Sequence, residues 1–173
     1  MSFEYQPTLT GHLVELTPLR REHHDALYAV ASDPLIWEQH PASNRHDEGV
    51  FRTFFEDAMA SGGALLATDT STRRVIGSSR YHGYDEERSE VEIGWTFLAR
   101  SHWGGAYNGE MKQLMLEHAF RFVDRVVFLI GPGNVRSQRA VTKIGAVHVG
   151  ARRDGSGEER LLFEITAASF ARR

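Results

Sequence analysis

The sequence predicts one mixed α/β domain, and three observations support this fold class. The chain has 173 residues, a length that suits one domain with a substantial core. Short apolar runs typical of strands alternate with longer segments of helical periodicity. No internal repeat, low-complexity tract or linker interrupts this alternation. We therefore expect a single domain over residues 1–173, with a core over about residues 9–168 and one mixed sheet.

Seven segments are predicted as strands. They are Leu9–Leu16, Ala64–Thr68, Arg74–Tyr81, Glu90–Leu98, Val126–Ile130, Ala146–Ala151 and Arg160–Ile165. The fifth is an unbroken apolar run, which is typical of a strand covered on both faces. The fourth alternates, which predicts Val91, Ile93, Trp95 and Phe97 on one face and Glu92, Gly94 and Thr96 on the other. Turn-forming residues predict hairpins across residues 69–73 and 154–157.

Four segments are predicted as helices, at residues 17–31, 47–60, 108–123 and 134–144. The first is expected to begin at Thr17-Pro18 and to end before Asp33-Pro34, because proline disfavours helix in the residue before it. Glycine is common just after the last residue of a helix, so Gly62 and Gly145 are expected to end the second and fourth helices.

Composition excludes several classes of protein. The net charge is −3 and the pI about 6.3, so no basic field points to nucleic acid or to an anionic membrane. With no cysteine, the chain has no disulfide, thiolate metal site or cysteine nucleophile. No basic and apolar leader or long apolar run is present, so we expect a cytoplasmic protein outside the membrane. The nine histidines form no His-Glu-x-x-His pairing, so we expect no metal.

The segment Arg100–Glu110 has the pattern of a phosphate-binding turn. It joins a predicted strand to a predicted helix and contains small residues that let the backbone approach a ligand. The first N–H groups of a helix lack internal partners, and with the helix dipole they favour an anion. A tight connecting turn without a ligand would show the same spacing.

Two common nucleotide motifs fail at this turn and elsewhere. A P-loop requires a Gly-Lys-Ser/Thr ending, and Gly104–Glu110 has no lysine. The segment Gly131–Arg136 starts like a dinucleotide-binding fingerprint but lacks its last glycine.

Four segments in order resemble the GNAT superfamily of acyl-CoA N-acyltransferases, and most of all its RimJ/RimL branch. They are Val91–Trp95, Trp103–Tyr107, Asn134–Ala140 and Lys143–Ala146. The resemblance extends from about Leu9 to Ile165 and implies a GNAT-like fold with a mostly antiparallel, twisted sheet. Its pyrophosphate loop has the form Gln/Arg-x-x-Gly-x-Gly/Ala. Gly104 and Ala106 match this form, whereas Ser101 stands at its first position and Arg100 lies one residue early.

The resemblance implies a coenzyme A site built from three segments. Pyrophosphate would bind backbone donors from Trp103 to Gly109, and pantetheine would follow the end of the preceding strand and meet Asn134. The residues expected to bind the cosubstrate are Phe97, Leu98, Arg100, Trp103, Gly104, Gly105, Ala106, Tyr107, Asn108, Gly109, Asn134, Ser137, Arg139 and Lys143.

Three residues have alternative roles. Ser137 stands at the position of the family's general acid, although serine is also ordinary in a first helical turn. Asn134 is a good N-cap for its helix, and it can cap and bind pantetheine together. A mid-strand carboxylate needs an explanation, and Glu92 could be a base acting through water, a substrate anchor or the partner of an arginine.

In the family, the first helices and the segment Arg80–Val91 build the acceptor pocket. Trp37, His40, Tyr81, His82 and Glu92 are therefore expected to bind the acceptor. The alternative is that the aromatic residues belong to the core and the histidines to the surface.

These expectations describe an N-acetyltransferase that uses acetyl-CoA and no metal. The acetyl group would pass directly, in a ternary complex, to a primary amine at a protein N-terminus or on a small molecule, since no cysteine can carry it. A homodimer is suggested by relatives alone. Two alternatives remain, a catalytically silent acyl-CoA-binding module and a protein that binds another nucleotide, such as ATP or NAD, at the same turn.

Overall fold

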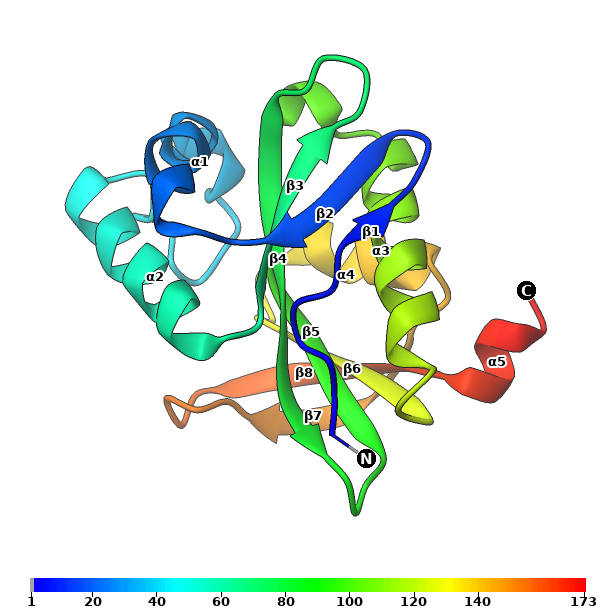
Figure 1. Ribbon diagram of the computed structural model, residues 1–173. Helices are drawn as coiled ribbons and strands as arrows, with labels where there is room; N and C mark the ends of the chain where they lie inside the picture. The colour runs from blue at the N-terminus through cyan, green and yellow to red at the C-terminus, as the bar shows by residue number, and fades with distance from the viewer. Residues whose placement is uncertain (1) are drawn as a thin grey trace.

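The computed structural model describes residues 2–173, which form one eight-stranded sheet with helices on both faces (Figure 1). The strand order is β1-β2-β3-β4-β5-β6-β8-β7. Only β5 and β6 run parallel, and every other neighbouring pair is antiparallel. The mixed, mostly antiparallel α/β fold is therefore confirmed.

The strands are β1 (Leu9–Thr10), β2 (Val14–Pro18), β3 (Ala64–Asp69), β4 (Val75–Asp85), β5 (Glu90–Leu98), β6 (Arg125–Ile130), β7 (Val147–Arg153) and β8 (Glu159–Thr166). The α-helices are α1 (His24–Ala31), α2 (Glu48–Ser61), α3 (Ala106–Ala119), α4 (Val135–Lys143) and α5 (Ala167–Ala171). Three single 3₁₀ turns precede helices or loops: η1 (Arg21–His23), η2 (Pro34–Ile36) and η3 (Arg100–His102).

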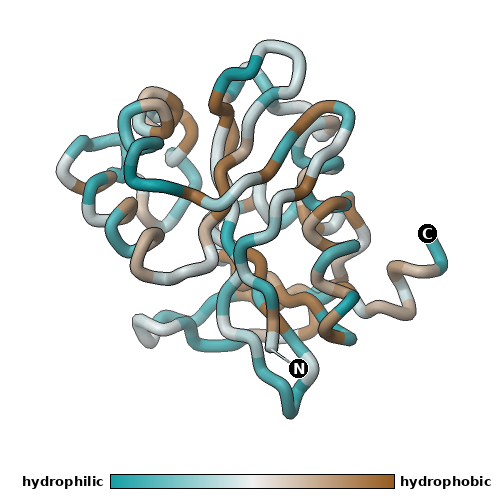
Figure 2. The backbone as a smooth tube through the Cα atoms, viewed as in Figure 1, coloured by the Kyte–Doolittle hydropathy of each residue, from teal (hydrophilic) through white to brown (hydrophobic). Residues whose placement is uncertain are grey.

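Helices α1 and α2 cover one face of the sheet, and α3 and α4 cover the other (Figure 1). Two clusters of buried side chains follow this division. The cluster on the α3 side includes Met111, Met115 and Val126, and the cluster on the α2 side includes Phe51 and Phe55. The turn that joins β4 to β5 is hydrophilic and projects from the sheet (Figure 2). The sheet therefore separates two hydrophobic cores, one on each of its faces.

Strands β5 and β6 separate along their length. Their pairing comprises only Glu90 with Arg125, Val91 with Val126 and Glu92 with Val127. Beyond Glu92 no further pairing joins the two strands in the described chain, so the rest of β5 has one free edge. This separation produces an opening in the sheet between the segments that follow β5 and β6.

The amino-terminal prediction was wrong in two respects. The segment predicted as one strand is two antiparallel strands, because residues 11–13 turn between them. The carboxylate of Glu110, on α3, accepts hydrogen bonds from the backbone N–H groups of His12, Leu13 and Val14 at this turn. Pro18 ends β2, where it pairs with Leu65, and does not begin a helix. This split and the short helix α5 raise the totals to eight strands and five α-helices in residues 2–173.

The alternation predicted for β5 is also wrong after Gly94. Gly94 pairs with Arg80 and Phe97 pairs with Ser78, so β5 has one extra residue in this interval. Trp95 takes it up with a φ of 54°, in the left-handed region. An extra residue in a bulge reverses the alternation that follows it. Trp95 and Phe97 consequently lie on the α2 side of the sheet with Glu92, rather than opposite to it.

No helix in residues 2–173 is long and apolar enough to cross a membrane.

Candidate functional site

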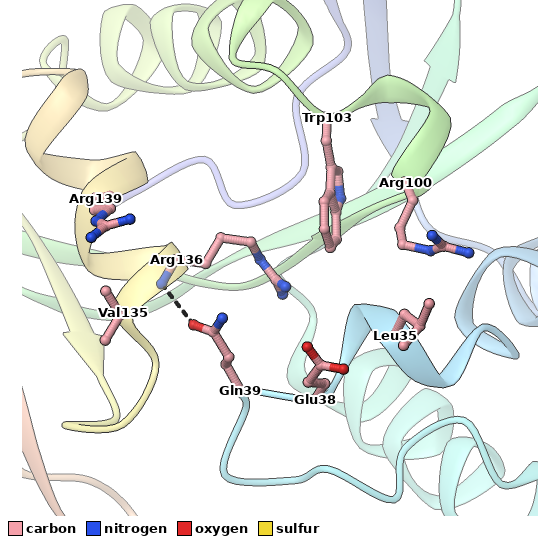
Figure 3. Close-up of a pocket in the computed structure, with 8 residues that line it drawn as sticks. All are labelled: Leu35, Glu38, Gln39, Arg100, Trp103, Val135, Arg136 and Arg139. Carbon is pink, nitrogen blue, oxygen red and sulfur yellow. Dashed lines mark hydrogen bonds between the residues drawn. The ribbon is translucent and has the colours of Figure 1, made fainter.

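A cavity of about 390 Å³ lies between the segments that follow η2, β5 and β6 (Figure 3). Its walls are formed by Leu35, Glu38, Gln39, Arg100, Trp103, Val135, Arg136 and Arg139. Leu35 belongs to η2, and Glu38 and Gln39 belong to the segment after it. Arg100 and Trp103 come from η3 and its end, and the last three residues come from α4. The separation of β5 from β6 therefore places a hollow with three arginines between two helical segments.

The amino end of α3 is open to an anion. Gly104 and Gly105 have φ values of 115° and 105°, in the left-handed region that favours glycine. No side chain caps the helix, so its first N–H groups, at the positive end of the helix dipole, have no side-chain partner. The Nζ of Lys143, at the end of α4, lies 2.5 Å from the position that a Cβ on Gly105 would take. A helix terminus and an ammonium group thus converge at the predicted phosphate turn.

The turn before α3 is held by a buried carboxylate on β3. Asp69 accepts hydrogen bonds from His102 Nε2 at 2.9 Å and from the Tyr107 hydroxyl at 3.1 Å. Hydrogen bonds from His102 and then from Ser71 hold the pKa of Asp69 well below its usual range. Ser101 Oγ lies 2.8 Å from His102 Nδ1, so it joins this network. The side chains of Ser101 and Tyr107 support the turn, which leaves its backbone to meet a ligand.

Two other residues of the predicted loop also have protein partners. The Arg100 guanidinium is ion-paired with Asp33, at the start of η2. The Trp103 indole N–H donates to the Leu98 carbonyl at 2.9 Å. The Trp103 ring stacks under the guanidinium of Arg136, 4.2 Å from its centroid, and Figure 3 shows this pair in the cavity. Arg100 and Trp103 therefore shape the cavity wall, as does Arg139 from the next helix.

Asn134 caps α4, as its alternative role predicted. Its Oδ1 accepts the backbone N–H of Ser137 at 3.3 Å, and the residue is 4% exposed. The Ser137 hydroxyl takes part in none of the hydrogen bonds found within residues 2–173 and is half-buried. The side chain of Asn108 is hydrogen-bonded within the protein, because its Oδ1 accepts from the Nζ of Lys112 at 3.2 Å. The Ser137 hydroxyl and the side-chain amide nitrogen of Asn134 are therefore available to a ligand.

Glu92 is the last residue of β5 that pairs with β6, and its carboxylate has an unusual environment. Burial raises its pKa to about 7, against the opposing charges of Arg152 and Arg80. No hydrogen bond or ion pair within residues 2–173 reaches this carboxylate. Arg152 instead donates to Glu90 at 2.6 Å, so the role of Glu92 as an arginine partner is not observed. A carboxyl that titrates near neutral pH can accept a proton under physiological conditions.

Aromatic rings and arginines gather near Glu92 on the α2 side of the sheet, and we call this group the acceptor-side cluster. It consists of Trp37, His40, Arg45, Phe54, Arg80, His82 and Trp95. The Arg80 guanidinium lies 4.3 Å from the centroid of Trp95, and that of Arg45 lies 4.3 Å from Phe54. The rings of His82 and Trp95 are 5.3 Å apart, and those of Trp37 and His40 are 5.5 Å apart. Both predicted histidines thus belong to one cluster with two arginines.

His40 is neutral at physiological pH. Burial, with the nearby charges of Arg45 and Arg160, lowers its pKa to about 4. Its Nδ1 accepts the backbone N–H of Ala42 at 2.9 Å.

Tyr81 lies outside the acceptor-side cluster, contrary to expectation. It is fully buried on the α3 side, where its hydroxyl donates to the Met115 carbonyl at 2.6 Å. Trp37 is 2% exposed, and its indole N–H donates to the Ala31 carbonyl at 2.8 Å. Both rings are core residues, which is the alternative that the sequence left open for them. Within the acceptor-side cluster, Trp37 offers only the face of its ring to Arg45.

Arg80, Arg45 and Asp69 are site residues that the sequence patterns did not predict. Arg80 is next to last in the predicted strand Arg74–Tyr81, where a charge is ordinary, and it lies in the middle of a strand only because β4 extends to Asp85. Arg45 lies in a loop where its position against Phe54 depends on the fold. Asp69 resembled an ordinary turn residue at the end of a strand, and only its partners 33 and 38 positions away show its function.

The model of the acetyltransferase (GNAT) domain matches residues 14–147. Solved structures share the fold. A GCN5-related N-acetyltransferase from Brucella melitensis has a TM-score of 0.85 at 18% identity, with 98% of this chain and 83% of that chain covered. RimJ of Mycobacterium smegmatis, in complex with CoA-disulfide, has a TM-score of 0.68 at 21% identity, covering 95% and 89%.

A third structure is spermidine N-acetyltransferase from Vibrio cholerae in complex with CoA and spermine. Its TM-score is 0.67 at 12% identity, and the coverage is 93% of this chain and 99% of that chain. No curated protein matches the sequence.

Proposed function

The chain belongs to the acetyltransferase (GNAT) domain family, and on this premise we propose that it transfers the acetyl group of acetyl-CoA to a primary amine. The amine is that of a peptide N-terminus or of a small molecule. One observation carries the proposal. The sheet opens immediately after Glu92, whose pKa is near 7, and an uncapped helix terminus with Lys143 beside it lies on the same opening.

The residues around the opening fit coenzyme A. The N–H groups of residues 103–109 and the ammonium of Lys143 would hold pyrophosphate, and Arg139 adds a further cation. The free edge of β5 at Phe97 and Leu98 would align pantetheine, with Asn134 across the opening. Support comes from the fold shared with the M. smegmatis and V. cholerae proteins, which were both solved with coenzyme A or its disulfide.

Acetyl-CoA supplies an activated thioester, and the protein must supply a neutral amine. A peptide α-amine has a pKa of ~7.7–8.0, so roughly a tenth of it is neutral at pH 7. Glu92, with a pKa of about 7, accepts the remaining proton directly or through water. Such a matched base makes an α-amine or another amine of low pKa a better substrate than a lysine, whose pKa is ~10.4.

Ser137 acts at the opposite end of the reaction. Its free hydroxyl lies in the first turn of α4, next to Asn134, and donates a hydrogen bond to the departing thiolate. A thiol has a reference pKa of ~8.5, so the thiolate needs modest help, and positioning contributes more to the rate. With no cysteine in the chain, the amine attacks the thioester directly in a ternary complex.

The test is release of free thiol from acetyl-CoA with N-terminal peptides, polyamines, aminoglycosides and amino acids as acceptors. We expect release with at least one amine and a matching acetylated product. Ser137→Ala should bind coenzyme A as the wild type does and turn over more slowly. Binding of coenzyme A without release for any acceptor would contradict catalysis and favour a silent acyl-CoA-binding module.

A further inference from the structure

We propose that the acceptor amine carries a carboxylate, which binds between Arg80 and Arg45 while its amino group faces Glu92. This inference rests on the proposed function and specifies its substrate class. Three observations carry it: a buried arginine without a partner, a second arginine beside it, and the position of both relative to Glu92.

Arg80 is a buried cation that lacks a hydrogen-bonding partner. The residue is 6% exposed, and its Nε and Nη2 are buried without a partner in residues 2–173. Its guanidinium lies over Trp95 at 4.3 Å and near Phe54 at 5.6 Å, so its contacts within residues 2–173 are with rings and not with a carboxylate. Buried charges in proteins are normally paired, because an unpaired one loses its hydration. The planar N–H fork of arginine matches a carboxylate, which points to an anionic ligand.

Arg45 adds a second positive charge to the same place. Its guanidinium lies 4.3 Å from the centroid of Phe54, the ring that Arg80 also approaches. Burial and then the charge of Arg80 lower the pKa of Arg45 to about 10, so both groups remain charged at neutral pH. Asp57 on α2 and Glu92 act on Arg80 electrostatically, but neither forms an ion pair with either arginine within 4.0 Å. Both arginines therefore approach the ring of Phe54, and neither is paired with a carboxylate of residues 2–173.

Glu92 is a sheet neighbour of Arg80, which places it near the amino group of the same ligand. Arg80 pairs with Gly94, two residues from Glu92 on the same face of β5, which makes Arg80 and Glu92 diagonal neighbours. Diagonal neighbours in a sheet are roughly 7–8 Å apart, and their Cβ atoms are somewhat closer. Gly94 has no side chain, and the Glu92 carboxylate lies over it, with one oxygen 3.1 Å from the position that a Cβ on Gly94 would take. A carboxylate and an amine separated by a few bonds can span this interval, with the anion at Arg80 and the amine at Glu92.

The same geometry disfavours a polycation. Spermine, which the V. cholerae relative binds, would bring several positive charges against Arg80 and Arg45. Like charges repel strongly where water is excluded. The acceptor-side cluster of this chain thus selects for an acidic or zwitterionic amine.

Matched acceptor pairs test this proposal and identify the source of the carboxylate. One arm compares alanine and glutamate with their fully amidated forms, and the other compares C-terminally amidated peptides that begin with Asp or with Asn. Spermine is the polycation. We expect kcat/KM to be roughly 10-fold or more higher for the carboxylate member in at least one arm. Equal rates within both pairs, or a preference for spermine, would overturn the proposal.

Three variants separate anion binding from structure. In Arg80→Met and Arg45→Gln we expect KM for the preferred acceptor to rise roughly 10-fold or more, while kcat changes less. Arg52→Gln, on the exposed side of α2 beside Glu48, should leave KM unchanged. Because Arg80 is unpaired in the free protein, Arg80→Met should melt no lower than the wild type. An unchanged KM in folded Arg80→Met and Arg45→Gln would refute the carboxylate site.

A binding measurement makes the two proposals separable. Glutamate, added with coenzyme A, should raise the melting temperature of the wild type and of Arg52→Gln, but not of Arg80→Met. If this holds and no amine is acetylated, the proposed function fails and the carboxylate site stands. If acetylation occurs, but only with acceptors that lack a carboxylate, the carboxylate site fails and the proposed function stands.

Discussion

The ammonium group of Lys143 lies against Gly105, 2.5 Å from the position of a Cβ that the glycine does not have. This contact brings the last residue of α4 to the first turn of α3. Gly105 also has a φ of 105°, which side chains strongly disfavour. The φ value keeps this position a glycine, and the absent side chain leaves room for the flexible end of Lys143 beside the open helix terminus.

Gly105→Ala should weaken coenzyme A binding by roughly 10-fold or more, because the methyl group displaces Lys143 and strains the turn. Isothermal titration with coenzyme A measures this loss. The control is Gly49→Ala on α2, where the nearest atom to the new Cβ is 3.4 Å away. An unchanged affinity in Gly105→Ala would show that the phosphate groups bind elsewhere.

Glu92→Gln should lower kcat by roughly 10²–10⁴, the usual contribution of a general base. A base works when it is deprotonated, and burial raises the pKa of Glu92 to about 7. The wild-type kcat/KM should therefore fall below pH 7 through the loss of two groups, the base and the neutral amine. Glu92→Gln should show only the ionisation of the amine.

Glu87→Gln, in the exposed turn between β4 and β5, is the control and should keep the wild-type profile. A Glu92→Gln variant with the same acid limb as the wild type would assign the base to another group.

Asp69→Asn should lower the melting temperature by a few degrees and weaken coenzyme A binding at the same time. His102 and Tyr107 donate to one oxygen of the carboxylate, and Ser71 and Thr72 donate to the other. An amide nitrogen cannot accept, so the variant loses one of these two sets of hydrogen bonds and the anchor of η3 and α3 weakens. Thermal denaturation and titration with coenzyme A measure the two effects. Asp25→Asn, whose side chain is fully exposed on α1, should change neither. Loss of stability with full affinity for coenzyme A would show that Asp69 supports the fold without positioning the turn.

Lys112→Met should change the dependence of stability on pH. Burial lowers the pKa of Lys112 to about 7, although its Nζ donates to Thr96 and Asn108. Between pH ~7 and ~10 the unfolded chain, with a lysine pKa of ~10.4, binds more protons than the folded one. The free energy of unfolding should therefore rise with pH in this window, by up to ~1.4 kcal/mol per pH unit.

Urea denaturation at several pH values measures this slope, and Lys112→Met should lack it and be more stable at pH 7. Parallel slopes for the two proteins would mean that Lys112 stays charged in the folded state.

Local sequence signals predicted the parts of the site that depend on local structure. The open start of α3 follows from glycines at a junction between a strand and a helix, and Asn134 follows from the preference of asparagine for N-caps. Most helix and strand positions were likewise predicted from hydrophobic periodicity and turn residues. These features need no contact with distant parts of the chain.

Contacts between distant segments determined what the sequence did not reveal. The bulge at Trp95 arises from its pairing with β4, and this bulge brings Trp95 to the face that carries Glu92. The turn between β1 and β2 is held by Glu110, which is about a hundred positions away. Arg45 and Arg80 come near each other because both approach the ring of Phe54 on α2. A single sequence contains no pattern for such pairings.

The most direct test of the central claim is one assay of wild type and Glu92→Gln with acetyl-CoA, scored by free thiol and by acetylated product. Acceptors should include an amidated peptide, glutamate and spermine. We predict that thiol and acetylated amine appear together in the wild type and that both fall by the same factor in Glu92→Gln. No acetylated amine with any acceptor, from protein that binds coenzyme A, would contradict the assignment as an N-acetyltransferase.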